Sequence, residues 1–301
     1  MAETTGKIIR GIGGLFFVDT QGGVIPCRAR GRFRHDRNFL QVGDNVSVGI
    51  GEQGENTIET VLPRKNSLIR PPLANLDLIF VVIPSAAPAP DLPTVDKLTA
   101  IAVHNRISPA IVISKCGIDA QSAEHIRSIY SKSAIPVFVT DAVNGTGLDR
   151  LKSFIAAQPC GSISAFAGAS GAGKSTLLNT LFPELTLETG TVSEKTERGR
   201  HTTRKVELFR IGGGYIADTP GFTMLDFRRF DFFTKDDLPG AFPEFLPYIG
   251  KCRYRKCTHT KEDGCAILEA VSGGRIAAER HRSYLDLFET LKDKHDWDKK
   301  R

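Results

Sequence analysis

Long apolar runs are missing from this 301-residue chain. No stretch approaches the roughly 18 consecutive apolar residues of a membrane-spanning helix, and the N-terminal MAETTGKIIR lacks the apolar core of a secretory signal peptide. We therefore expect a protein that is neither secreted nor membrane-spanning. In that setting the six cysteines are better candidates for metal ligands or isolated thiols than for disulfides.

Acidic residues are also in the minority, since 34 Asp and Glu face 40 Lys and Arg and leave a net charge of +6. This balance favours polyanionic partners, although the same charge can serve solubility alone. The composition is otherwise that of an ordinary globular protein, with 41% hydrophobic and 25% charged residues. The length allows two or three domains.

Residues 7–61 contain short β-like runs separated by glycines, with no helix-period segment between them. The runs are KIIRGIGGLFFVDT, VIPCRARGRFR, VGDNVSVGI and TIETVL. This pattern predicts a small barrel or sandwich.

Four arginines recur at every second position of this region, namely Arg28, Arg30, Arg32 and Arg34. On a strand, that spacing places all four on one face and Phe33 on the other. We interpret the stripe either as the solvated face of an edge strand or as a phosphate-facing surface on a barrel of the oligonucleotide-binding (OB) type.

After PRKNSLIRPP at 63–72, interpreted as a linker, apolar runs alternate with helical segments. The expected strands are LIFVVIP, AIVISK, PVFVT and SISAFAG, and the expected helices lie near TVDKLTAIAVHN, QSAEHIRSIYSK and GLDRLKSFIA. Such alternation is typical of βαβ crossovers and of a parallel sheet covered on both faces. An α/β domain therefore follows the β module.

The run GASGAGKST fits G-x-x-x-x-G-K-[ST] between an expected strand and the expected helix KSTLLNTLF. Its glycines let backbone N–H groups turn toward phosphates, Lys174 supplies a mobile cation, and the Ser175 hydroxyl can bind Mg²⁺. These flanks leave little room for a chance glycine-rich turn. The predicted nucleoside triphosphate site comprises Gly168, Ala169, Ser170, Gly171, Ala172, Gly173, Lys174, Ser175 and Thr176.

A second phosphate-side element is expected where the strand GYIADTPGF, paired with KVELFRI, ends at Asp218. An Asp in this place can hold Mg²⁺ through water, and the Gly221 N–H can meet the γ-phosphate. Between this element and the glycine loop lies RGRHTTRK. As a switch loop, it would let Thr202 or Thr203 complete the Mg²⁺ shell.

Slow intrinsic hydrolysis is expected, because Phe222 follows D-x-x-G where many GTPases have a glutamine that orients the attacking water. His201 is the best candidate for a polar replacement, and the alternative interpretation of His201 is a solvated loop histidine.

An ATPase of the transporter type is a weaker interpretation of the sequence. VSGGR at 271–275 imitates the signature peptide of that class, but a charged amphipathic segment, not a strand ending in an acidic pair, follows it.

After residue 221, no expected buried strand ends in the guanine motif N/T-K-x-D. Before the glycine loop, an imperfect version ends the expected strand AIVISK, and VFVTDA lies where a second base-contacting loop would be. The chain would then run base loops, phosphate loop and switches, a circular permutation of the usual order. The expected base-contacting residues are Ser114, Lys115, Cys116 and Gly117.

Three cysteines and one histidine fall within 14 residues in the pattern C-x4-C-x-H-x5-C. The predicted ligands of one structural zinc ion, with no open position, are Cys252, Cys257, His259 and Cys265. Lys251, Arg253, Arg255 and Lys256 surround them. This zinc segment would either present a basic surface to RNA or only stabilise a small domain with little core.

The sequence resembles the circularly permuted, small-ribosomal-subunit-dependent GTPases of the RsgA type along nearly its whole length. The matching features, besides the permuted order, are CRARGRFR, VGDNVSV, RGRHTTR, DTPGF, C-x4-C-x-H-x5-C and RIAAERHRSYLDL. The resemblance implies a cytoplasmic assembly factor that binds the maturing small subunit and its rRNA through the barrel and zinc domains. It also implies hydrolysis of GTP to GDP, stimulated by the subunit, and supports His201 as the catalytic group.

The base motif departs from this family. Gly117 stands where the family has the guanine-reading Asp, and Ser114 where it has Asn or Thr, so Lys115 alone matches. Asp119 could substitute if the loop folds back, and backbone amides near Asp141 could still contact the base. The alternatives to a ribosome-assembly GTPase are therefore a P-loop hydrolase with relaxed base choice and an RNA-binding module with a non-catalytic nucleotide site.

The expected architecture is multidomain. We predict an OB-type β-barrel at 1–70, a circularly permuted P-loop α/β GTPase domain at 71–236 and a small helical zinc-binding domain at 237–301. The expected cofactors are one structural Zn²⁺ and the Mg²⁺ that accompanies GTP. We expect a monomer with no membrane partner.

Overall fold

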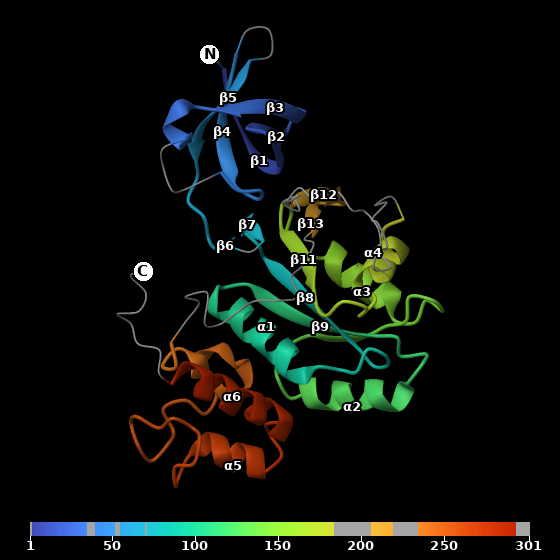
Figure 1. The fold of residues 1–301 in the computed structure, drawn as a ribbon, viewed down its shortest axis with the longest axis vertical. Coiled ribbons are helices and arrows are strands. Elements are labelled where there is room, and N and C mark those ends of the chain that lie inside the picture. Colours follow the sequence, from blue (N-terminus) through green and yellow to red (C-terminus); the bar gives the residue numbers. More distant parts are fainter. Residues whose placement is uncertain are drawn as a thin grey trace, which may run out of the picture. The chain divides into compact units, whose positions relative to one another are not determined.

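The computed structural model describes residues 2–34, 40–51, 55–69, 71–183, 206–218 and 234–292 (Figure 1). Contacts divide these residues into two compact units. The first unit holds residues 2–78, 156–166 and 206–218, and the second holds 79–155, 167–183 and 234–292, apart from the gaps just given.

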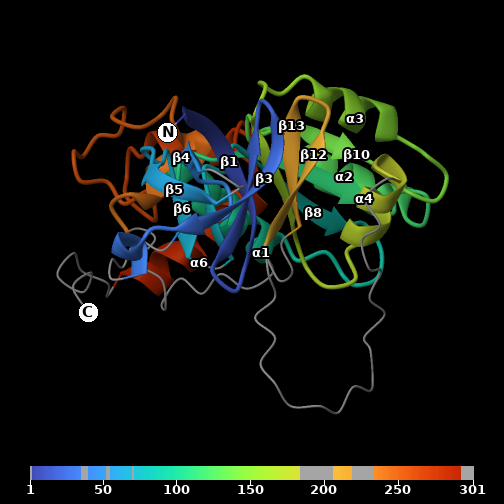
Figure 2. The same ribbon diagram turned by 90° about the horizontal axis from the view of Figure 1, so that it is seen from above.

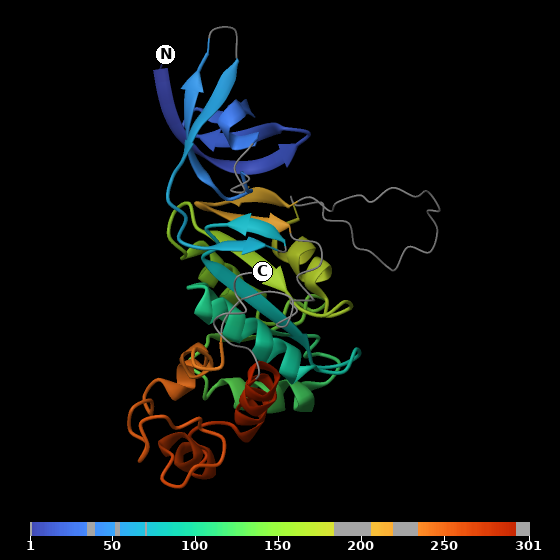
Figure 3. The ribbon, with the colours of Figure 1, turned by 60° about the vertical axis from the view of Figure 1, so that its left-hand side comes forward.

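The first unit opens with a five-stranded barrel, coloured blue in Figure 3. Its strands are β1 (Ala2–Ile12), β2 (Leu15–Thr20), β3 (Gly23–Ala29), β4 (Asn45–Ile50) and β5 (Asn56–Val61). They follow the order β1-β2-β3-β5-β4, and β1 closes the ring by pairing with both β2 and β4. The fully buried core consists of Ile8, Val18, Cys27, Val46, Val48 and Ile58. The expected OB-like barrel is confirmed.

The arginine stripe predicted on this barrel is wrong. β3 ends at Ala29, and Gly31–Arg34 forms a 3₁₀ turn, η1, in which the Phe33 N–H donates to the Arg30 carbonyl over 3.0 Å. Pairing with β2 ends at Arg28, opposite Leu15, and pairing with β5 ends at Ala29, opposite Ile58. Arg28 is exposed, whereas Arg30 forms a 2.8 Å ion pair with Glu59.

The segment interpreted as a linker is instead a small hairpin of β6 (Ser67–Ile69) and β7 (Pro72–Ala74). Side-chain amides hold its ends together. Asn66 accepts from the Leu76 N–H at 2.9 Å and donates to the Leu76 carbonyl at 2.7 Å. Pro72 is tolerated as the first residue of its strand. Because side-chain amides take the place of backbone groups in holding this hairpin, the sequence shows no alternation of hydrophobic residues that would predict it.

Three further strands lie in the first unit, except for the last residue of the first of them: β11 (Ile163–Ala167), β12 (Glu207–Ile211) and β13 (Gly214–Asp218). β13 runs parallel to β11 and antiparallel to β12, beside which it lies in Figure 2. β12 also pairs with the barrel strand β1, through Arg10 opposite Glu207. Strand β12 is therefore hydrogen-bonded both to the barrel strand β1 and to β13, the strand that ends in Asp218.

The second unit contains β8 (Leu78–Pro84), β9 (Ser108–Ser114) and β10 (Val137–Val139) in the order β10-β9-β8. Its helices before and after β11 are α1 (Leu92–His104), α2 (Ala120–Tyr130), α3 (Leu148–Ala156) and α4 (Lys174–Leu181). β8 is buried along its whole length, as a strand covered on both faces should be. The base strands precede the phosphate-loop helix in the chain, so the permuted α/β order is confirmed.

The C-terminal part of the second unit is built from short helical pieces. These are η3 (Leu238–Ala241), η4 (Pro243–Phe245), α5 (Ala266–Ser272) and α6 (Ala278–Leu291), with α6 beside α1 in Figures 1 and 3. No helix in the described ranges is both long enough and apolar enough to cross a membrane.

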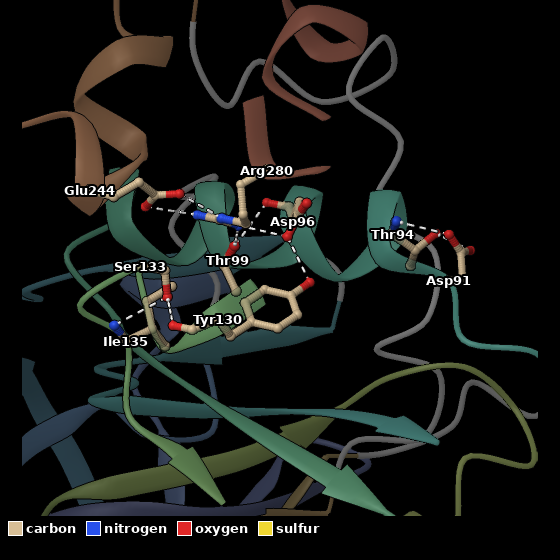
Figure 4. Close-up of polar contacts among 9 residues, drawn as sticks. All are labelled: Asp91, Thr94, Asp96, Thr99, Tyr130, Ser133, Ile135, Glu244 and Arg280. Carbon is tan, nitrogen blue, oxygen red and sulfur yellow. Dashed lines mark hydrogen bonds and ion pairs between the residues drawn. The ribbon is translucent and has the colours of Figure 1, made fainter. Parts of the chain in front are cut away.

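A buried ionic network joins α6 to α1 (Figure 4). The Arg280 guanidinium, 1% exposed, donates to Asp96 at 2.6 Å and to Glu244 at 2.6 and 3.1 Å. Tyr130 donates its hydroxyl to the same Asp96 carboxylate at 2.7 Å. Because two carboxylates and several hydrogen bonds surround the guanidinium, protein groups compensate its buried charge.

Candidate functional site

The glycine loop follows β11 and leads into α4. Gly168 has φ +140°, and a Cβ there would lie 2.3 Å from the Val82 carbonyl oxygen. Gly173, with φ +89°, occupies the position before the first turn of α4. Glycine suits both positions, because L side chains are strained at such angles. The loop backbone is thereby free to turn its N–H groups outward.

Lys174 opens α4 and bends back over the loop. Its Nζ donates to the carbonyls of Gly168 and Ala169 at 2.7 and 2.8 Å, and burial lowers the pKa of its amine. Ser175 is half-buried and Thr176 exposed in the same first turn. These positions fit the phosphate and Mg²⁺ contacts expected of the motif.

Ser114 and Lys115, at the end of β9, reach across to the glycine loop. The Ser114 hydroxyl donates to the Ala172 carbonyl at 2.6 Å. The Lys115 Nζ donates to the Gly171 carbonyl at 2.8 Å and to the Ala87 carbonyl at 2.6 Å. The imperfect base motif is therefore tied directly to the phosphate loop.

A pocket of about 460 Å³ opens between the two base loops and α4. Its lining residues are Ser114, Lys115, Gly117, Ile118, Thr140, Asp141, Ala142, Val143, Asn144, Gly173, Thr176 and Leu177. The structure thus brings together the segments that the sequence predicted as base loops and phosphate loop. Cys116 is half-buried, and burial followed by the charge of Asp141 raises the pKa of its thiol.

Asp119 does not supply the carboxylate missing from position 117. It precedes α2 and accepts from the Ser122 N–H at 2.8 Å, and it is not among the residues that line the pocket. The side chain of Asp141 lies there instead, which sequence reasoning missed. The available signal was a polar residue immediately after a strand end, in TDAVNGTG.

Asp218 is the last residue of β13, and it is half-buried with a pKa raised by burial. β11 is its parallel neighbour, so the carboxyl ends of these two strands share one edge of the sheet. His201, Thr202, Thr203, Gly221 and Phe222 lie outside the described residues.

The four predicted metal ligands gather at one point, with all ligand atoms within 4.8 Å of one another. The Cys252 sulfur lies 3.9 Å from the Cys265 sulfur, and both lie 3.5 Å from His259 Nδ1. Tetrahedral zinc, with Zn–S bonds of about 2.3 Å and Zn–N bonds of about 2.0 Å, places its ligands roughly 3.5–3.8 Å apart. The cluster can hold a metal ion, and its spacing fits zinc.

The neighbours of this cluster fix the ligand loop. His281 is 2.9 Å from the His259 carbonyl, and the Tyr284 hydroxyl donates to the Thr258 carbonyl at 2.7 Å. Burial opposes ionisation of Glu262, but hydrogen bonds from Thr258 and nearby backbone N–H groups outweigh it and lower its pKa to about 2. These hydrogen bonds therefore help to hold the ligand loop in place.

Comparison with known proteins agrees with this geometry. The family model described as RsgA GTPase matches residues 61–228, and that described as RsgA N-terminal domain matches residues 5–58. A small ribosomal subunit biogenesis GTPase RsgA from Moorella thermoacetica is 41% identical over 281 residues, covering 93% of this chain and 94% of that protein. The RsgA protein of Caldanaerobacter subterraneus is 40% identical over 296 residues, covering 98% of each.

Two solved structures are similar over the same length. YjeQ from Thermotoga maritima superposes with a TM-score of 0.81 at 30% identity, covering 98% of this chain and 100% of that one. YloQ, described as a circularly permuted GTPase, gives a TM-score of 0.79 at 30% identity and covers 98% and 96%. With the barrel, the permuted nucleotide site and the metal cluster in one order, this chain belongs to the RsgA GTPase family.

Proposed function

We propose that this protein binds the maturing small ribosomal subunit and hydrolyses GTP to GDP and phosphate while it is bound there. The observation that carries the proposal is the pocket joining the two base loops to the first turn of α4. The names of the relatives, which describe small-subunit biogenesis, supply the assembly context. Work on ribosomal subunits would place the protein in the cytoplasm, and we propose that it acts as a monomer.

Phosphate binding falls to residues 168–176, with Lys174 as the cation that meets the phosphates. Ser175 and Asp218 would hold the Mg²⁺ that neutralises phosphate charge. Lys115 belongs to the base side of the site, because it lines the pocket between the base loops while its amine bonds the Gly171 and Ala87 carbonyls. The two lysines therefore have separate roles.

The hydrolytic step is assigned to the switch segments. Thr202 or Thr203 would complete the Mg²⁺ shell, the Gly221 N–H would meet the γ-phosphate, and His201 would orient the attacking water. These roles rest on the sequence motifs, since residues 201–203 and 221 lie outside the described ranges.

RNA binding is proposed for both ends of the chain. Lys251, Arg253, Arg255 and Lys256 are all exposed around the metal cluster, and Tyr254 beside them is 50% exposed. Exposed basic residues interleaved with an aromatic ring suit phosphates and stacked bases. On the barrel, exposed Arg28 lines a hollow of about 410 Å³ together with Phe16 and Phe33.

Zinc is the metal we propose for Cys252, Cys257, His259 and Cys265, in a structural role, because four protein ligands leave no position for a reactive water. We also propose the domain boundaries expected from the sequence, at 1–70, 71–236 and 237–301. The cluster would then lie within the third domain.

The test is nucleotide turnover by the full chain with and without purified small ribosomal subunits. We expect slow GTP turnover alone and a marked increase with subunits. His201→Ala should abolish the increase and leave GDP affinity nearly unchanged, whereas Lys174→Ala should also lose nucleotide binding. Absence of turnover in both conditions would favour an RNA-binding module, and equal turnover of ATP would favour relaxed base choice.

A further inference from the structure

Position 117 has no side chain, and a second residue occupies the space that one would fill. A Cβ built on Gly117 would lie 2.6 Å from Asp141 Oδ2, 3.3 Å from Asp141 Cγ and 2.8 Å from Asn144 Nδ2. A side chain at position 117 therefore cannot coexist with the Asp141 carboxylate in its present position, and one of the two must shift. Asp141 comes from the loop after β10, whereas Gly117 follows β9.

The Asp141 carboxylate is held in place from both loops. Its Oδ2 accepts from the Gly117 N–H at 2.8 Å, and its Oδ1 accepts from the N–H groups of Val143 at 2.8 Å and Asn144 at 3.3 Å. The residue is 5% exposed. Burial works to raise its pKa, but the Val143, Gly117 and Asn144 N–H groups outweigh burial and lower it. An ionised acceptor therefore stands in the pocket lining at neutral pH.

The remaining hydrogen-bonding capacity of this carboxylate decides which base suits it. An ionised carboxylate offers about four acceptor sites, and N–H groups of the described residues occupy three of them. The fourth can take one N–H from a base. Guanine presents N–H donors at its ring nitrogen N1 and its 2-amino group, whereas adenine presents a lone pair at N1 and no 2-amino group. A carboxylate here attracts the first base and repels the second.

We propose that Asp141 selects guanine in this protein, in the place of a carboxylate at position 117. This inference rests on the proposed function, because it assumes that the pocket receives the base of GTP or GDP. One hydrogen bond to a charged group corresponds to a preference of about tenfold to a hundredfold. That preference is smaller than two such bonds would give.

The experiment transfers the carboxylate from position 141 to position 117. Displacement of a fluorescent GDP analogue by GDP and by ADP is measured for the full-length wild type, for Asp141→Ser, and for Asp141→Ser combined with Gly117→Asp. We expect the wild type to prefer GDP by about tenfold to a hundredfold. Asp141→Ser should bring the two affinities close together, and the double variant should restore the preference for GDP. Gly117→Asp alone should weaken binding of both nucleotides, because the two carboxylates crowd each other.

Asp119→Ala is the matched control, since it removes a carboxylate two residues from Gly117 that does not line the pocket. Its GDP-to-ADP ratio should equal that of the wild type. If Asp141 only stabilises its own loop, Asp141→Ser will weaken GDP and ADP equally, and the inference fails. It also fails if the wild type shows no preference. GTP turnover with small subunits judges the proposed function separately, because it needs no discrimination between bases.

Discussion

The nucleotide pocket and the metal cluster lie in the same unit but are built in opposite ways. The glycine loop beside the pocket depends on close backbone contacts, since Gly168 lies against the Val82 carbonyl and the Ser114 and Lys115 side chains bond to carbonyls of the loop. The cluster is formed by four side chains within 14 residues. The glycine loop should therefore lose nucleotide binding when an atom is added to it, and the cluster should lose its metal when a ligand atom is removed.

The largest effect is expected from adding one carbon to the glycine loop. Gly168→Ala would place a Cβ 2.3 Å from the Val82 oxygen at a φ of +140°. We expect GDP affinity, measured by calorimetry, to fall by about a hundredfold or more, since small displacements of binding groups have effects of that order. Gly22→Ala, whose Cβ would meet nothing closer than 3.8 Å, should bind normally. Wild-type affinity in Gly168→Ala would contradict the contrast.

Removing a metal ligand should affect the metal cluster and leave the nucleotide pocket unchanged. Structural zinc contributes about 10–16 kcal/mol of binding free energy in small zinc-finger peptides, so Cys257→Ala should lose most of the metal and loosen the C-terminal segment. We expect one zinc per wild-type chain by metal analysis, weaker small-subunit binding in the variant, and faster proteolysis after residue 234. GDP affinity should stay the same. A metal-free protein with an intact C-terminal fold would refute the structural role.

The network around Arg280 tests whether the two regions are separable. Breaking a buried ion pair by removing one partner typically lowers the free energy of unfolding by about 3–5 kcal/mol, and Arg280→Ala leaves Asp96 and Glu244 without the guanidinium that pairs with both. We expect that loss in denaturant unfolding. Arg127→Ala, which breaks only the exposed pair with Glu124, is the control. A change in GDP affinity at temperatures where Arg280→Ala is folded would show that α1 connects the regions.

The smallest effect is expected at the edge of the base pocket. Ser114→Ala removes the hydrogen bond to the Ala172 carbonyl, an interaction worth about 0.5–1.5 kcal/mol. GDP affinity in titrations should fall by up to about tenfold. Ser128→Ala, which removes an exposed hydroxyl bonded to the His125 carbonyl, should leave it unchanged. An equal loss in both variants would mean that the Ser114 bond has no part in shaping the loop.

Contiguous patterns were predictable from the sequence, and contacts between distant segments were not. The alternation of strands and helices, the glycine loop and the four metal ligands depend on neighbours in the chain, so their spacing carries the information. The arginine stripe was mispredicted because β3 ends at Ala29 and the chain enters the 3₁₀ turn η1 at Gly31. The alternating arginines alone do not show where the strand ends.

The base pocket is a second example of a contact between distant segments that the sequence pattern does not reveal. Gly117 could be recognised as a departure, but its consequence depends on Asp141, which lies 24 residues further along the chain. The β6–β7 hairpin escaped prediction for a related reason, since Asn66 and Asn75 hold it through side-chain amides. In each case a polar side chain makes the interaction that sequence patterns attribute to another residue, as at position 117, or to the backbone, as in the hairpin.

The Arg280 network also sets an order in time. Asp96 and Arg280 are 184 residues apart, so at about 5–20 residues per second of synthesis the carboxylate waits roughly 10–40 s for its partner. A polypeptide that stops short of α6 never receives the guanidinium, and its Asp96 must stay hydrated or take up a proton. Incomplete copies are thereby the less stable ones, and cellular proteases can distinguish them from finished protein without any dedicated signal.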